Sequence, residues 1–202
     1  MGVFENEKKI ALKKMVENDK SKKGSLDKEI IELLNAINSL QQYYTTSSCS
    51  GRIMLIEVPK ERRKDKVKWL YVTHEKAEFE VLSKILFENK LNLKEGSSIW
   101  FKQEPLILHV CCRTLDDAQK LIDIARYSGF KKSGIIATRK RIIVEIEGTD
   151  LMSTIVYDKT GVLITKEYLK KLVQVANKKL IRNLNKKEKF LKELKKEFKI
   201  RT

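Results

Sequence analysis

The sequence is poor in residues that cross-link small folds or build glycine-rich nucleotide sites. Its 202 residues include three cysteines, two prolines and eight glycines. Cys49, Cys111 and Cys112 are an odd, sparse set that makes no disulfide framework, and no Cys-x-x-Cys pair supports a zinc site. Neither Gly-x-Gly-x-x-Gly nor Gly-x-x-x-x-Gly-Lys occurs, which argues against a Rossmann-type site and a P-loop. We therefore expect a reducing, cytoplasmic setting and no bound metal.

Long hydrophobic runs are also missing. No apolar stretch approaches the roughly 20 residues that span a bilayer, and the N-terminus lacks the apolar core of a secretory signal. Hydrophobic residues nevertheless make up 42% of the chain, enough for a packed interior. The composition predicts a folded protein with no membrane association.

Acidic residues are outnumbered, with 27 Asp and Glu against 43 Lys and Arg and a net charge of +16. Half of the excess lies in residues 178–201, which hold eleven basic residues and three acids. RNA is the commonest cytosolic polyanion that such a surface meets. A lysine-rich solvated helix face explains the run equally well, so charge alone leaves both interpretations open.

Hydrophobic periodicity predicts helices near both ends of the chain and strands between them. Helices are expected over residues 4–17, 25–40, 77–89, 114–128 and 165–202, and strands over residues 43–46, 52–56, 68–73, 99–103, 106–112, 135–138, 141–147, 151–157 and 162–164. We predict one α+β domain spanning residues 1–202, with a helical N-terminus (1–41), a mixed core (42–164) and a basic C-terminal helix (165–202). The expected sheet is mixed and largely antiparallel, the terminal helices pack together, and the fold is not of the Rossmann type.

A run of small polar residues, Thr45–Arg52, lies between two expected strands. Hydroxyls and backbone amides before a glycine can bind one anion, and Arg52 adds a planar fork for carboxylate or phosphate. Cys49 is a conceivable nucleophile, but it needs an adjacent base. An ordinary polar turn with a buried cysteine is the third interpretation.

The two histidines lie at strand positions. In the strand over residues 106–113, alternation places His109 and Arg113 on the same face, where they can bind an anion or move a proton. His74 ends another strand, and a histidine satisfied within the core remains an alternative for His109. The segment Asp19–Asp27 either turns and caps a helix or, through Lys22 and Lys23, binds phosphate.

In this order, the segments resemble the tRNA wybutosine-synthesizing protein 3 family. Ser-Ser-Cys-Ser-Gly-Arg at 47–52 and Leu-His-Val-Cys-Cys-Arg at 108–113 carry most of the resemblance. The other matching pieces are residues 19–27, 69–74, 104–107, 118–119, 128–130, 133–135, 167–168 and 175–178. The resemblance implies transfer of a methyl group from S-adenosylmethionine to N-4 of the tricyclic wybutosine precursor, a base next to the anticodon of tRNA-Phe.

The resemblance also implies roles for individual residues. The expected general base is His109, followed by Asp27, Asp19 and His74. The cofactor is expected at Ser47, Ser48, Ser50, Gly51, Arg52 and Arg113. The anticodon arm of tRNA-Phe is expected at Lys22, Lys23, Arg139, Lys140, Lys186, Lys187, Lys189 and Lys192. No family residue is placed within 142–151, and we expect a monomer or a small homo-oligomer.

Two other functions compete with methyl transfer. The missing cofactor motif would suit a non-catalytic tRNA-binding component of the wyosine pathway. A hydrolase with Cys49 as its nucleophile is the second alternative, and it would need no cofactor.

Overall fold

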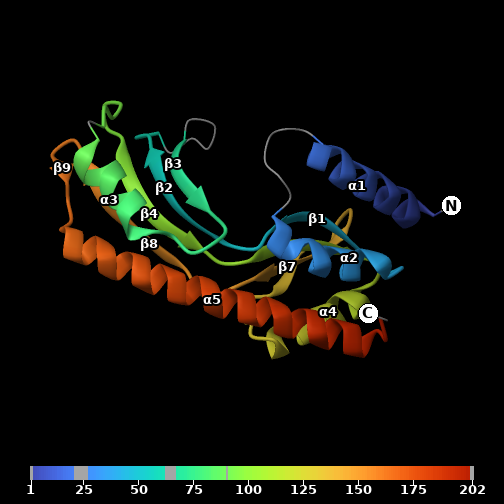
Figure 1. Ribbon diagram of the computed structural model, residues 1–202. Helices are drawn as coiled ribbons and strands as arrows, with labels where there is room; N and C mark the ends of the chain where they lie inside the picture. The colour runs from blue at the N-terminus through green and yellow to red at the C-terminus, as the bar shows by residue number, and fades with distance from the viewer. Residues whose placement is uncertain (1, 21–26, 62–66, 90, 201–202) are drawn as a thin grey trace. The chain divides into compact units, whose positions relative to one another are not determined.

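The chain forms two compact units, each assembled from separate stretches of sequence. The computed structural model describes residues 2–20, 27–61, 67–89 and 91–200, without the side chains of residues 16–20 (Figure 1). The first unit contains Met1–Ser50, Leu106–Thr149 and Asn183–Thr202, and the second contains Gly51–Pro105 and Asp150–Arg182. Each unit therefore combines segments that lie far apart in the sequence.

The first unit is a four-stranded sheet with helices on both faces. Its strand order is β1-β5-β7-β6, and every neighbouring pair is antiparallel. Its elements are α1 (Val3–Lys20), η1 (Lys28–Ile30), α2 (Ile31–Ser39), β1 (Tyr43–Cys49), β5 (Ile107–Cys112), α4 (Leu115–Tyr127), β6 (Gly134–Ala137), β7 (Ile142–Glu147) and the second part of α5 (Lys166–Glu197).

Strand alternation divides the first sheet into two faces. One face carries Tyr43, Leu108 and Val144, which are buried with side chains of α2, α4 and α5 in a single apolar core. Tyr44, the neighbour of Tyr43, points the other way and meets α1, where its ring lies 5.1 Å from that of Phe4. Helix α1 therefore covers part of the face opposite the core.

The second unit is a five-stranded antiparallel sheet in the order β3-β2-β4-β8-β9. Its elements are β2 (Arg52–Val58), β3 (Lys68–Thr73), α3 (Phe79–Ser83), η3 (Lys84–Glu88), β4 (Ser98–Glu104), β8 (Met152–Asp158), β9 (Gly161–Val162) and the first part of α5. Leu55 and Phe101 of the sheet, Leu82 of α3 and Leu172 of α5 belong to one buried cluster. One face of this sheet is thus covered by helices.

The α+β class predicted from the sequence is confirmed, with two differences of detail. The strands form two wholly antiparallel sheets and not one mixed sheet. Of the N-terminal helices, α2 shares a core with α5. Helix α1 lies against the face of the first sheet that carries Tyr44, and its Met15 also packs against that core. Within the described part of the chain, each helix is too short or too polar to span a bilayer.

Two asparagines of α5 form side-chain hydrogen bonds with backbone groups that have no partner in a helix or strand ladder. In the first unit, the fully buried side chain of Asn183 accepts from the Leu106 amide (2.8 Å) and donates to the Ser50 carbonyl (2.6 Å). In the second unit, Asn177 bonds the amide and the carbonyl of Ala77, at 2.8 and 3.0 Å. Each amide side chain satisfies one donor and one acceptor that burial would otherwise leave unpaired.

We expect Asn183→Ala to lower the free energy of unfolding by roughly 2–4 kcal/mol, because each buried backbone group left without a partner costs about 1–3 kcal/mol. Urea denaturation measures the loss. Asn185→Ala is the matched control, since Asn185 is exposed on the same helix; it should change the stability by about 0.5 kcal/mol or less. Equal stabilities for the two variants would contradict the role given to Asn183.

Candidate functional site

Three polar side chains lie in a row across the first sheet, on the face opposite its core. Ser47 of β1 is directly opposite His109 of β5, which is directly opposite Glu145 of β7. The Ser47 Oγ lies 2.8 Å from His109 Nδ1, and His109 Nε2 lies 2.7 Å from Glu145 Oε2. The side chains of His109 and Glu145 are each 28% exposed, so the row is open to solvent. His109 is therefore not a core histidine.

An extra residue in β1 determines which hydroxyl faces His109. Thr45 pairs with Val110, so regular pairing would place Thr46 opposite His109, but the register shifts and Ser47 takes that position. Such a bulge changes the direction of a side chain at the cost of local ladder pairing. The Thr46 hydroxyl instead donates to the His109 carbonyl at 3.4 Å.

The hydrogen-bond partners determine the tautomer of His109. An ionised Glu145 can only accept, so Nε2 carries a proton that it donates to the carboxylate. Nδ1 is then free to accept the hydroxyl proton of Ser47. A hydroxyl, an imidazole and an orienting carboxylate in this order form an arrangement that moves protons in many enzymes. The row can take one proton at Ser47 and hold it on His109.

Helix α1 covers the adjacent part of the same face. Its Glu7 accepts from the Tyr44 hydroxyl (3.1 Å) and pairs with Arg141 (2.9 Å). Arg113, predicted to bind the cofactor, pairs with Glu5 at 2.5 Å and lies 4.7 Å from the centre of the Phe4 ring. The guanidinium of Arg113 is thus engaged by α1.

The polar run predicted as a turn is mostly strand. Ser47, Ser48 and Cys49 are the last residues of β1, so the side chains of Ser47 and Ser48 point to opposite faces of the sheet. Ser50 is fully buried; its amide donates to the Asp27 carboxylate (2.8 Å), and its carbonyl accepts from Asn183. The prediction of a turn was wrong, because the expected strand ended three residues too early.

Asp27, predicted as a possible base, has a structural role within the first unit. Its Oδ1 caps the short helix η1 by accepting from the Glu29 amide at 3.2 Å, while its Oδ2 accepts from Ser50. Lys22 and Lys23, predicted to bind RNA, and the side chain of Asp19, predicted as a base, lie outside the described residues.

The predicted residues of the second unit form a separate set of contacts. His74 Nδ1 donates to the Gly51 carbonyl at 2.8 Å, and Gly51 has a φ of 106°. Arg52 pairs with Glu104 through Nη2 (2.9 Å) and Nε (3.0 Å). Its guanidinium carbon also lies 4.7 Å from the centre of the Trp69 ring. Arg52 is therefore held by one carboxylate and one indole.

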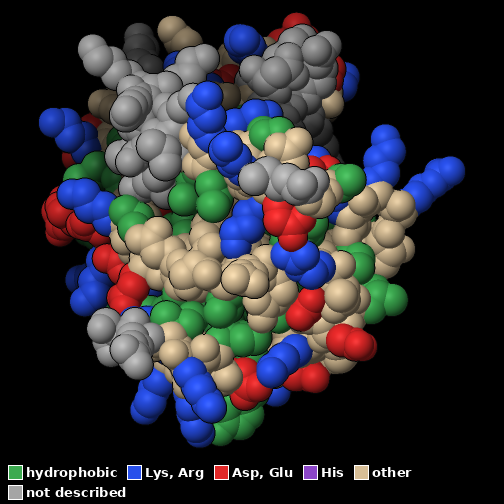
Figure 2. All heavy atoms as spheres, turned by 90° about the vertical axis from the view of Figure 1, so that its right-hand side faces the viewer, with side chains coloured by type: hydrophobic (Ala, Val, Ile, Leu, Met, Phe, Trp, Pro, Cys, Tyr) green, Lys and Arg blue, Asp and Glu red, His purple; other side chains and the backbone are tan. Residues whose placement is uncertain are grey.

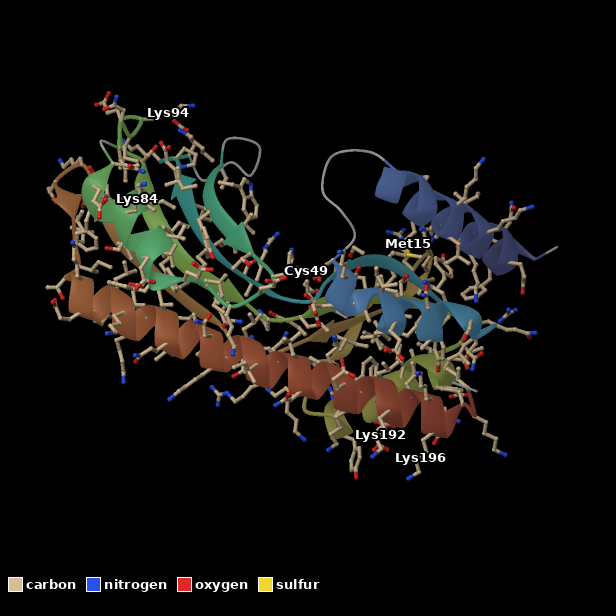
Figure 3. All side chains as sticks on the ribbon, viewed as in Figure 1. Met15, Cys49, Lys84, Lys94, Lys192 and Lys196 are labelled. Atoms are coloured by element: carbon tan, nitrogen blue, oxygen red, sulfur yellow. The ribbon has the colours of Figure 1, made fainter. Side chains whose placement is uncertain are left out.

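The lysines predicted to bind RNA on α5 differ in exposure. Lys192 points away from the helix into solvent, as Lys196 does (Figure 3). Lys189 is exposed, bonds the Tyr127 carbonyl at 3.0 Å and lies over the Tyr127 ring. Lys187 is buried, 5% exposed, and its ammonium bonds Glu29 and Glu188. Burial keeps the Lys187 ammonium from contact with a phosphate, so Lys187 does not belong to an RNA-binding surface.

The remaining positive charge is widely distributed. Arg139 and Lys140, predicted to bind RNA, are exposed between β6 and β7, and Lys186 is half-buried. Figure 2 shows Lys and Arg side chains spread over the face turned to the viewer, with Asp and Glu side chains between them. The charge on this face is mixed and not gathered in one basic patch.

Glu145 was missed by the sequence reasoning. It lies in the interior of strand β7, which was predicted over residues 141–147 and has a second acid, Glu147, at its end. An acid within this apolar run was the available signal. Its partner remained unknown because the pairing of β7 with β5 joins segments far apart in the chain.

Comparison with known proteins gives consistent results. A family model described as Methyltransferase TYW3 matches residues 6–196. The chain is 38% identical over 194 residues to the tRNA(Phe) 7-((3-amino-3-carboxypropyl)-4-demethylwyosine(37)-N(4))-methyltransferase of Thermococcus sibiricus, covering 96% of this chain and 95% of that one. It is 39% identical over 178 residues to tRNA wybutosine-synthesizing protein 2/3/4 of Arabidopsis thaliana, 82% of this chain but 18% of that protein. The solved structure of the PH1069 protein from Pyrococcus horikoshii is similar, with a TM-score of 0.83, 35% identity and 95% of both chains covered.

The three cysteines should differ sharply in reactivity. Cys111 and Cys112 are buried, and burial raises the pKa of each thiol, whereas Cys49 is half-exposed. Because the thiolate is the reactive form, iodoacetamide at mildly alkaline pH should alkylate Cys49 in the folded protein and all three cysteines in urea. Mass spectrometry of the intact chain measures the number of adducts. A second adduct appearing as fast as the first in the folded protein would contradict this.

Proposed function

The chain belongs to the Methyltransferase TYW3 family, and from this we propose that it methylates N-4 of a tricyclic wyosine-type base in tRNA(Phe). The relatives' names support the reaction and the substrate, because the Thermococcus sibiricus protein, matched over nearly its whole length, is named for both. A cytoplasmic location, where tRNA is available, belongs to the same proposal.

The observation that carries the proposal is the row formed by Ser47, His109 and Glu145. Methylation of a nitrogen that carries hydrogen releases one proton. The Ser47 hydroxyl accepts this proton while passing its own to Nδ1 of His109. Glu145 keeps the Nε2 proton bonded and stabilises the imidazolium that forms. One N–C bond forms as the bond between the methyl carbon and the donor's sulfur breaks, and the sulfur would leave as a neutral thioether. One N–H bond breaks, and its proton leaves to solvent from the half-exposed imidazole.

S-adenosylmethionine is the proposed methyl donor, and it supplies a methyl group bonded to a positively charged sulfur. The site face offers hydroxyl and carboxylate groups suited to a cation, from Ser47 and Glu145. The ion pair of Arg113 with Glu5 is partly exposed, with the arginine side chain 41% accessible. Such pairs contribute only about 0–1 kcal/mol, so a ligand carboxylate can replace the glutamate. Ser48 and Gly51 remain proposed contacts of the donor.

The chemical assignment is tested by single-turnover methylation of hypomodified tRNA, followed by mass spectrometry of the nucleosides. The unaltered protein should add one methyl group to the tricyclic base. His109→Asn should slow the step by roughly 10²–10⁴-fold, the contribution of a general base. The affinity for tRNA should change little, because the base acts in the transition state.

Glu145→Gln should slow the same step less than His109→Asn, because an amide presents a weaker acceptor to Nε2–H. Glu147→Gln is the matched control on the same strand and face, and it should keep nearly full activity. Thermal melting verifies that each variant is folded. An unchanged nucleoside mass with tRNA bound would refute the proposed reaction, and a silent His109→Asn would refute the proton route alone.

We also propose that exposed lysines of α5 bind tRNA phosphates. Replacing Lys189, Lys192 and Lys196 with Gln should weaken binding and lower the slope of log affinity against log salt, by roughly 0.7–0.9 for each phosphate that the variant no longer neutralises. The matched control removes the same charge at the exposed Lys84, Lys94 and Lys159. Equal slopes for the two variants would show that net charge, and not local contact, sets the affinity.

A further inference from the structure

The second sheet has one face that carries both tryptophans of the chain. Ile56 of β2 is directly opposite Trp69 of β3 on one side and Trp100 of β4 on the other. Directly opposed residues of antiparallel strands point to the same face. The three side chains therefore form a row, which we call the tryptophan face.

This face lies opposite the apolar core of the second unit. Ile53, Leu55 and Phe101, which alternate with the residues of the tryptophan face, are buried with side chains of α3 and α5. Helix α5 runs along that side of the sheet (Figure 1). Among the described residues, the buried cluster of this unit includes neither Trp69 nor Trp100.

The tryptophan face carries several exposed apolar side chains. Trp69 is 47% exposed, Val72 46% and Ile155 39%. Val72 is opposite Met54, and Ile155 is opposite Trp100, so both belong to the same face. Clustered exposed apolar side chains, unlike scattered ones, mark a surface that contacts a partner.

Charge on the tryptophan face indicates what kind of partner it fits. Arg52 and Lys102 lie on it together with Glu104, which pairs with both, at 2.9 and 3.6 Å. The double contact with Glu104 holds the Arg52 guanidinium over the Trp69 ring. A fixed cation beside a flat aromatic surface suits a ligand that combines a planar base with a phosphate.

We propose that the tryptophan face is a stacking platform for unpaired bases of the anticodon loop, an inference that rests on the proposed tRNA substrate. Sheets with exposed aromatic rings bind single-stranded RNA in this way, because every base has a flat face that stacks. The platform holds the loop through Trp69 and Trp100 while Arg52 and Lys102 meet its phosphates. Duplex RNA is a poor ligand, because its bases are already stacked and paired.

The tryptophans themselves report on this proposal, because Trp69 and Trp100 are the only two in the chain. A single-stranded RNA with the anticodon-loop sequence should quench the intrinsic fluorescence saturably, and the same strand within a duplex should not. Trp69→Leu should weaken binding of the single strand by roughly 5–150-fold, equivalent to about 1–3 kcal/mol per stacked base. Trp69→Phe keeps a ring and should restore part of the affinity.

Tyr168→Leu is the matched control, since Tyr168 is an exposed aromatic residue of α5 in the same unit. It should bind the single strand like the unaltered protein, and thermal melting verifies that all variants are folded. Binding of labelled single strand without quenching, or full affinity in Trp69→Leu, would overturn the platform. No methyl donor is needed, so failed methylation with intact quenching would count against the proposed reaction and not against the platform.

Discussion

The antiparallel pairing of β5 with β1 on one side and β7 on the other is the interaction on which the first unit depends. Backbone hydrogen bonds fix the register, and the register determines two things at once. On one face it places Leu108 and Val110 in the apolar core. On the other it aligns His109 with Ser47 and Glu145 at hydrogen-bond distance. A slip of one residue would exchange the two faces, so core packing and site geometry select the same register.

Much of the fold followed from periodicity, and the parts that did not have a common cause. A helix was predicted over residues 114–128, and in the structure Thr114 starts it with a full capping box to Asp117. The strand over Lys68–Thr73 was predicted with its exact bounds. The residue pattern of a single segment is enough to predict such features. The division of the strands into two sheets depends on pairing between distant segments, which a single sequence does not reveal.

The same distinction applies to the site. His109 was found from the sequence because alternation and the family resemblance both single it out. Its bond to Glu145 depends on β5–β7 pairing, and its bond to Ser47 depends on the extra residue Thr46 in β1. The prediction that Lys187 binds nucleic acid was wrong. It rested on the density of positive charge in α5, but the side chain turns inward and pairs with Glu29. Composition locates charge along a chain but does not tell which side of a helix presents it.

Helix α5 contributes side chains to both apolar cores, Leu172 and Ala176 to one and Phe190 and Leu194 to the other. This has a consequence during protein synthesis. Chains leave the ribosome from the N-terminus at a rate of about 5–20 residues per second. Neither core is complete until α5 has emerged, so the strands of both sheets must wait with one face uncovered.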